Sequence, residues 1–261
     1  MKKLMIFIVL LMVSNITIAQ EKLFLLFEFM QVDNEQEAAY RDTEEFWEKI
    51  HKERVKAGDI IGWDLWLLSP GGEQQGFQYL TVALYSDPIK MMDGSSWEHL
   101  MDRAKAAYPD MTETDLDKKL NHSSETRDLA VRIFTEEIAT TKGEFDMPIG
   151  TVAQIDMMKV SLENCRSYEK AEKEIFQPIH QKTVDAGGKA NWGLVRFISP
   201  IGSDAYASHM TVSMFKDYKQ VLDEYDNWNK AAVTPNKAIE DGLSLRDLKY
   251  VYMANLIRKV R

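Results

Sequence analysis

The sequence repeats itself at about half its length, and this duplication limits the folds that the chain can adopt. Three segments of the first half recur in the second: residues 47–58 at 176–187, residues 81–85 at 211–215, and residues 127–129 at 246–248. The offset changes from 130 to 119 between the last two matches, so the first copy carries 11 extra residues. A repeat of this length indicates two copies of one domain rather than a solenoid.

Length and composition agree with two small domains. The chain has 261 residues, which we divide into a leader at 1–19, a first domain at 20–142 and a second at 143–261. Hydrophobic residues make up 45% and charged residues 28%, as in ordinary globular proteins. The net charge of -9 repels phosphate backbones and anionic lipid, so we expect no nucleic-acid partner and no membrane partner after leader cleavage.

The first 19 residues have the pattern of a Sec-type signal peptide. Lys2 and Lys3 precede an apolar stretch at residues 4–13, and Ala19 precedes the expected cleavage point before Gln20. The alternative, a membrane anchor, needs about 20 apolar residues, and this stretch is half as long. We therefore expect export to the periplasm or the medium. The single cysteine, Cys165, excludes an intramolecular disulfide and is interpreted as a buried or inert residue.

Each copy predicts the element order βαββαβ. The expected elements of the first copy are strands at 23–32, 60–68, 77–85 and 129–139, with helices at 35–57 and 88–108. Those of the second copy are strands at 151–160, 191–198, 207–215 and 248–259, with helices at 163–186 and 218–232. In the extra segment, Thr112 and Asp115 form a capping-box pattern that predicts a short helix, interpreted as a surface elaboration. This order is that of the ferredoxin-like split βαβ unit.

The tandem βαββαβ units and the repeated W/F-x3-H-x3-V-x-A-G segment resemble the dimeric α/β-barrel superfamily. That superfamily includes antibiotic-biosynthesis-type monooxygenases, NIPSNAP-like proteins and stress-responsive barrel proteins. The resemblance implies an α+β fold in which two tandem ferredoxin-like βαββαβ repeats form an intrachain α/β barrel. It also implies that ligands bind inside the barrel or between the sheet and the helices. The matching residues identify no enzyme subfamily.

Strand alternation predicts which side chains line the barrel. Leu80, Val82 and Leu84 share one strand face, which we assign to the helices, and the opposite face carries Tyr79 and Tyr85. We assign this second, aromatic and polar face to a lumen that binds a small, moderately polar or aromatic molecule. The candidate ligand-binding residues are Glu28, Trp66, Tyr79, Tyr85, Arg132, Asp156, Arg196 and Tyr252. The alternatives for this face are a solvated surface and a homo-oligomer interface.

Three histidines are candidate catalytic residues. His51 and His180 occupy equivalent positions on the helix stripe that faces the sheet. Each is either a general base or axial haem ligand, or a core histidine that ties the helix to the following loop, and the duplication favours the core role. His209 replaces Tyr79 and breaks the symmetry of the copies. No metal site is expected, and the cofactor is left unassigned because no phosphate loop or dinucleotide fingerprint is present.

Three functions remain open from the sequence. The first is non-catalytic binding of a small ligand in the barrel. The second is a barrel-type oxygenase or isomerase, cofactor-free or haem-linked, with a histidine as base or ligand and Glu28 or Asp156 assisting. The third is a structural module that uses the sheet face as an interface. Asymmetry between the copies should distinguish these three functions. Examples of such asymmetry in the sequence are Asp64 against Leu194 and Trp66 against Arg196.

Overall fold

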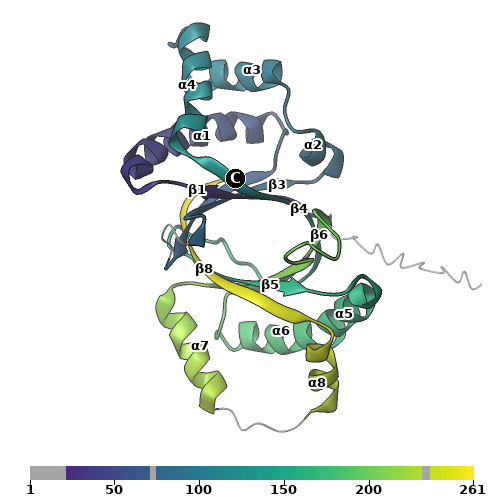
Figure 1. Cartoon of the computed structure of the whole chain (residues 1–261). Coiled ribbons are helices and arrows are strands. Elements are labelled where there is room, and N and C mark those ends of the chain that lie inside the picture. The colour runs from purple at the N-terminus through teal and green to yellow at the C-terminus, as the bar shows by residue number, and fades with distance from the viewer. Residues whose placement is uncertain (1–21, 71–74, 231–235) are drawn as a thin grey trace, which may run out of the picture.

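The chain forms a closed barrel of eight antiparallel strands with helices outside it (Figure 1). The computed structural model describes residues 22–70, 75–230 and 236–261, so the expected leader lies outside the described residues. The strands of the first copy are β1 (Phe24–Gln31), β2 (Gly62–Ser69), β3 (Tyr79–Tyr85) and β4 (Asp128–Thr140). Those of the second are β5 (Val152–Lys159), β6 (Asn191–Ser199), β7 (His209–Phe215) and β8 (Asp247–Val260).

Each copy contributes one four-stranded sheet to the barrel. The order around the barrel is β1-β3-β2-β8-β5-β7-β6-β4, so β2 pairs with β8 and β4 pairs with β6 where the two copies meet. Within each copy the strands follow the ferredoxin-like order, with the first and third strands central. The predicted tandem ferredoxin-like fold and intrachain barrel are therefore confirmed.

The helices of the first copy build a second core outside the sheet. They are α1 (Glu37–Lys56), α2 (Pro88–Asp93), α3 (Trp97–Ala107) and α4 (Glu113–Thr126). The single helix expected at 88–108 is two helices, because Gly94 has a φ of 68° and Ser96 caps α3. Thr112 caps α4 as predicted, yet α4 is more than a surface elaboration. Its Leu116 and Leu120 are buried against α1 and α3.

The long helix of the second copy contains one inserted residue. It consists of α5 (Cys165–Ala171), a π-helical turn (Glu172–Phe176) and α6 (Gln177–Asp185). The offset between the copies is 128 at Glu44 and Glu172 but 129 at His51 and His180. The π-turn absorbs this extra residue, so that the helix faces on both sides of it still meet the sheet. Two further helices, α7 (Tyr218–Lys230) and α8 (Lys237–Ser244), complete the copy.

Strand pairing corrects the alignment of β2 with β6. Trp63 pairs with Ala83, and Trp192 pairs with Ser213, so the two tryptophans are equivalent. Asp64 therefore corresponds to Gly193 and not to Leu194, while Trp66 corresponds to Val195 and not to Arg196. The offset between the copies changes from 129 to 130 between Phe197 and Ser199, where β6 has a bulge in its pairing with β4.

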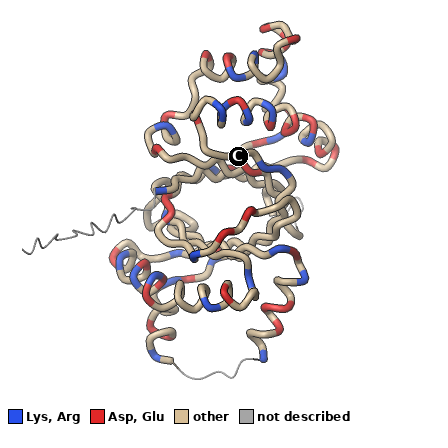
Figure 2. Tube along the Cα trace, turned by 180° about the vertical axis from the view of Figure 1, so that it is seen from behind, with Lys and Arg blue, Asp and Glu red and all other residues tan. Residues whose placement is uncertain are grey.

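The outer helices carry basic and acidic residues side by side (Figure 2). Several are joined one helical turn apart, as in the pairs Lys52–Glu48 and Lys219–Asp223. Such exposed pairs contribute little to stability. Among the described residues, no helix has the length and apolar character needed to cross a membrane.

Candidate functional site

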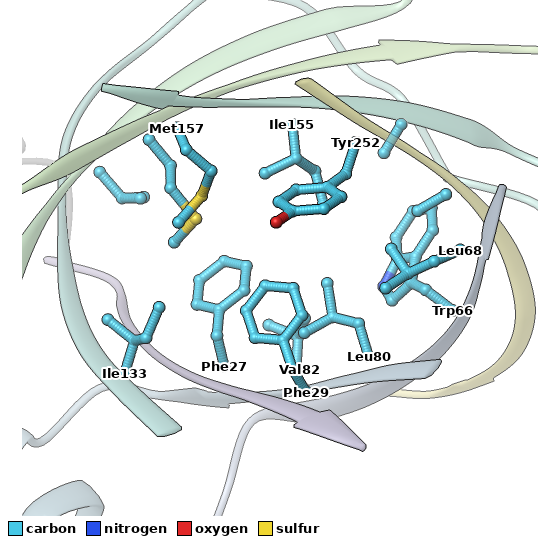
Figure 3. Close-up of a cluster of buried hydrophobic side chains, with 14 of the residues drawn as sticks. Phe27, Phe29, Trp66, Leu68, Leu80, Val82, Ile133, Ile155, Met157 and Tyr252 are labelled. Carbon is cyan, nitrogen blue, oxygen red and sulfur yellow. The ribbon is translucent and has the colours of Figure 1, made fainter. Parts of the chain in front are cut away.

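The barrel lumen is lined by aliphatic and aromatic side chains (Figure 3). Leu80 and Val82 of β3 and Met210 of β7 point inward, so the assignment of this face to the helices was wrong. Alternation defines two faces of a strand but does not say which one is inside. In this barrel the aliphatic face fills the narrow interior, and the face with tyrosine, threonine and histidine lies under the helices.

One end of the lumen contains a cavity of about 370 Å³, which we call the aromatic cavity. Its lining residues are Phe29, Phe77, Val131, Ile133, Met157, Phe197, Pro200, Ala205, Tyr206, Ala207, Tyr250 and Tyr252. The ring centroids of Phe29 and Phe77 are 4.8 Å apart, and those of Phe77 and Tyr252 are 5.4 Å apart. Figure 3 shows the Tyr252 hydroxyl directed into the lumen. Burial raises the pKa of Tyr252 to about 12, so this hydroxyl stays protonated and can donate a hydrogen bond.

The other end contains a smaller aliphatic cavity of about 150 Å³. Trp66, Val82 and Ala153 are among its lining residues, and the buried Asp64 carboxylate forms a two-pronged ion pair with Arg261, at 2.8 and 2.9 Å. Burial raises the pKa of Asp64, although Arg261 opposes the shift. Of the predicted ligand-binding residues, Trp66 and Tyr252 thus lie in the lumen, at opposite ends.

The repeated histidines lie outside the lumen, each stacked on the first tryptophan of the next strand. The ring centroids of His51 and Trp63 are 4.6 Å apart, and those of His180 and Trp192 are 4.7 Å apart. Burial holds the pKa of His51 well below its usual value, and nearby Arg54 adds to the shift. Burial and Lys189 lower the pKa of His180 to about 3. Both rings are therefore neutral at pH 7 and join helix to sheet.

His209 is part of a chain of polar groups that runs from the second copy to Glu136 of the first copy. It lies on β7 beneath α5, with Nε2 3.3 Å from the Glu169 carboxylate. Arg196 contacts the same carboxylate at 3.0 Å and reaches Glu136 at 2.8 Å. Burial alone would raise the pKa of Glu169, but His209 and Arg196 lower it overall. The structure therefore brings two predicted site residues, Arg196 and His209, together outside the barrel.

The other predicted residues lie on the same outer face. Glu28 pairs with Arg132 at 2.6 Å, and the equivalent Asp156 accepts hydrogen bonds from Gln154 and Thr211. Tyr79 packs on a helix tyrosine, and the Tyr85 hydroxyl accepts a hydrogen bond from Arg54. These side chains connect the sheet to the helices, and their ligand-binding role stays a prediction. No cluster of metal-ligating side chains occurs within residues 22–70, 75–230 and 236–261.

Sequence reasoning missed a buried group that is present twice. In the first copy, Glu44 of α1 pairs with Arg127 at 3.1 Å beneath Tyr40. In the second copy, Glu172, Arg246 and Tyr168 repeat the arrangement, and the carboxylate and guanidinium are 3.8 Å apart. The Arg-Asp-Leu segments at 127–129 and 246–248 align the two copies, but the sequence pattern assigns no partner to their arginines. Both carboxyls lie on the buried stripe of the long helix, which is the signal that could have revealed them.

Glu172 should make stability depend on pH. Burial raises its pKa to about 7 from an ordinary value near 4.5, so between these values the native state binds a proton that the unfolded state has released. The free energy of unfolding should then fall as the pH rises from 4.5 to 7, with a contribution of about 3 kcal/mol from this group. Urea unfolding across this range measures it. Glu172→Gln should remove the contribution, and an unchanged difference between the two ends of the range would contradict the assignment.

Comparison with solved structures identifies the fold. A putative monooxygenase from Fusobacterium nucleatum subsp. nucleatum superposes with a TM-score of 0.54 and 11% identity, over 92% of this chain and 94% of that chain. A putative monooxygenase from Lactobacillus acidophilus gives 0.53 and 11%, over 92% and 96%. An anthrone oxidase-like protein gives 0.51 and 14%, over 93% and 94%. The chain has the dimeric α/β-barrel fold. No family model and no curated protein matches the sequence.

Within the dimeric α/β-barrel fold, this chain holds both sheets in one polypeptide, and its similarity to the three structures extends over nearly its full length. At identities of 11 to 14%, this likeness establishes the architecture and leaves the chemistry to the residues themselves.

Proposed function

We propose that the protein is an exported carrier that binds one compact, largely apolar molecule in the aromatic cavity of the barrel, without catalysis. The observation that supports this most is the cavity of about 370 Å³ inside the lumen, lined almost entirely by apolar and aromatic side chains. A cavity of this kind, with one or a few polar groups, is the usual form of a small-molecule site. The Tyr252 hydroxyl is one polar group directed into the lumen.

The placement of the ionisable residues supports binding over acid-base catalysis. His51, His180 and His209, the predicted bases, all lie outside the lumen, so none of them meets a molecule held there. A general base must reach the proton that it removes and must have a pKa near the working pH. His51 and His180 also fail the second requirement, because burial keeps both pKa values low.

Two alanines allow each lumen cavity to be filled separately. Ala207 lines the aromatic cavity and Ala153 lines the aliphatic cavity. We expect the neutral fluorescent probe N-phenyl-1-naphthylamine to bind the protein. Ala207→Phe should weaken binding by about tenfold or more, because the new ring occupies the aromatic cavity. Ala153→Phe, the control, should change the affinity by less than about twofold. Fluorescence titration measures both. Equal effects of the two variants, or no binding by the folded wild type, would overturn the proposal.

Native mass spectrometry tests the natural ligand and the export together. The chain is expressed with residues 1–19 in place, and native and denaturing spectra of the exported protein are compared. We expect cleavage before Gln20 and a native mass that exceeds the chain mass by one small molecule, lost on denaturation. A retained leader would contradict export and leave the binding result intact. A native mass at a multiple of the chain mass would support the predicted homo-oligomer.

A further inference from the structure

The second copy buries a lysine where the first copy buries an isoleucine. Lys189 comes two residues after Gly187, as Ile60 comes two residues after Gly58, and both glycines have a positive φ, 76° and 72°. Lys189 is 7% exposed and Ile60 is 2% exposed. Burying an amine costs free energy that an aliphatic side chain does not. Because the first copy folds with isoleucine here, the fold does not require the amine.

Polar partners accompany this lysine. Its Nζ lies 3.1 Å from Nδ1 of His180 on α6 and 3.2 Å from Oγ of Ser213 on β7. The ring of Phe215 lies 5.7 Å from Nζ. Ser213 occupies the position of Ala83 in the first copy, since each pairs with the tryptophan of the neighbouring strand. The amine and its hydroxyl partner are therefore both specific to the second copy.

The first copy supplies its histidine with a different cation. Nη1 of Arg54, a partly exposed residue, lies 3.3 Å from Nδ1 of His51. A guanidinium stays protonated and is not a nucleophile, whereas a buried lysine amine loses its proton more readily. Burial lowers the pKa of Lys189, although Glu224 of α7 and Asp156 of β5 oppose the shift. The uncharged amine is the reactive form of lysine toward carbonyl compounds.

A loosely packed helix borders this amine. The Tyr225 hydroxyl of α7 donates a hydrogen bond of 2.6 Å to Gln154, whose first-copy equivalent is Leu26. Val221 of α7 is buried, but Leu222 and Trp228 are 63% and 77% exposed. Elements with few buried apolar contacts open locally at low free-energy cost. Opening of α7 would give small molecules access to Lys189.

We propose that Lys189 is a nucleophilic amine that condenses with a compact aldehyde or ketone between α6 and β7. The amine nitrogen bonds to the carbonyl carbon, the carbonyl oxygen leaves as water with both amine protons, and an imine remains. No oxidant or reductant is consumed. His180 accepts a hydrogen bond from the amine and Ser213 contacts it from the strand, so both orient Lys189 and act as positioning residues.

Reductive trapping at single-residue resolution tests this proposal. The folded protein is treated at pH 7 with propanal and cyanoborohydride, and modification is followed by peptide mapping. We expect Lys189 to react at least about tenfold faster than Lys182 of α6 and Lys219 of α7, because a larger share of its amine is uncharged at pH 7. Both are exposed lysines on the neighbouring helices. Reaction of Lys189 at or below the rate of these controls would overturn the proposal.

Two variants distinguish a positioned amine from an accidental one. Ser213→Ala restores the first-copy residue and should slow the Lys189 reaction several-fold while Lys182 is unaffected. Lys189→Ile also restores the first-copy residue and should raise the melting temperature, because it removes a buried amine that the fold does not need. A lower melting temperature for Lys189→Ile would show that the lysine serves stability, and an unchanged rate in Ser213→Ala would remove the positioning role.

Discussion

Arg127→Ala is expected to lower the free energy of unfolding at pH 7 by about 3 to 5 kcal/mol, because it leaves the Glu44 carboxyl buried without its cation. The Glu44 side chain is 2% exposed and lies 3.1 Å from the Arg127 guanidinium. Burial already raises the pKa of Glu44 against the opposing effect of Arg127. Without the arginine the carboxyl can take up a proton, so the loss should be smaller at pH 5. Chemical denaturation at both pH values measures it.

Strand β4, which begins directly after Arg127, offers a matched control for this substitution. Arg132 pairs with Glu28 at 2.6 Å, but its side chain is 51% exposed, so Arg132→Ala should cost less than about 1 kcal/mol. The double variant Arg127→Met, Glu44→Leu replaces the buried pair with apolar groups and should recover most of the lost stability. Similar losses for the two arginine variants would show that burial of the Glu44 pair is not the cause.

Acidification is expected to destabilise the protein through its two stacked histidines. The unfolded chain binds a proton on each near pH 6.5, whereas the native state does so near pH 3 for His180 and far below 6.5 for His51. Stability from these groups is complete above pH 6.5 and is lost as the pH falls below it, by about 1.4 kcal/mol per pH unit for each histidine. Over two pH units His180 alone should cost about 3 kcal/mol, and His51 should add to this loss.

A variant comparison isolates the histidines, because Glu172 acts in the opposite direction between pH 4.5 and 7. The free energy of unfolding is measured from pH 7 to 4.5 for the wild type, for His180→Gln and for His51→Gln, His180→Gln. His180→Gln should lack about 1.4 kcal/mol per pH unit of the wild type's acid sensitivity below pH 6.5, and the double variant should lack more. If the wild type and the double variant have the same pH slope, the histidines are protonated in the native state.

More of the fold than of the candidate site could be predicted from the sequence. Internal matches such as His51 with His180, together with strand and helix periodicity, predict two βαββαβ units because these patterns are local. Which face of β3 lines the lumen depends on how the two sheets meet, and this is a long-range property that alternation does not contain. The prediction was therefore inverted there, and Tyr79 and Tyr85 proved to lie beneath helices.

The helix insertion and the buried ion pair could not be predicted from the sequence, for physical reasons. The one-residue insertion in the π-turn Glu172–Phe176 changes the offset between the copies but not the apolar pattern of the helix. The π-turn keeps the buried stripe of the helix facing the sheet on both sides of the insertion. The buried partners Glu44 and Arg127 are 83 residues apart in sequence, and their pairing follows from the packing of α1 on the sheet. By contrast, the predicted position of Tyr252 in the lumen is correct, because the side chains of its strand alternate and Tyr252 falls on the face that lines the aromatic cavity.

The pairing of β2 with β8 and of β4 with β6 makes the two copies a single folding unit. Either half alone would expose the aliphatic face that carries Leu80 or Met210, together with an unpaired strand at each edge of its sheet. The boundary near residue 142 therefore separates the two sequence repeats, but it does not separate two independently stable domains. Fragments cut there should need each other, or a second copy of themselves, to stay soluble, and substitutions on one half should shift the unfolding of both.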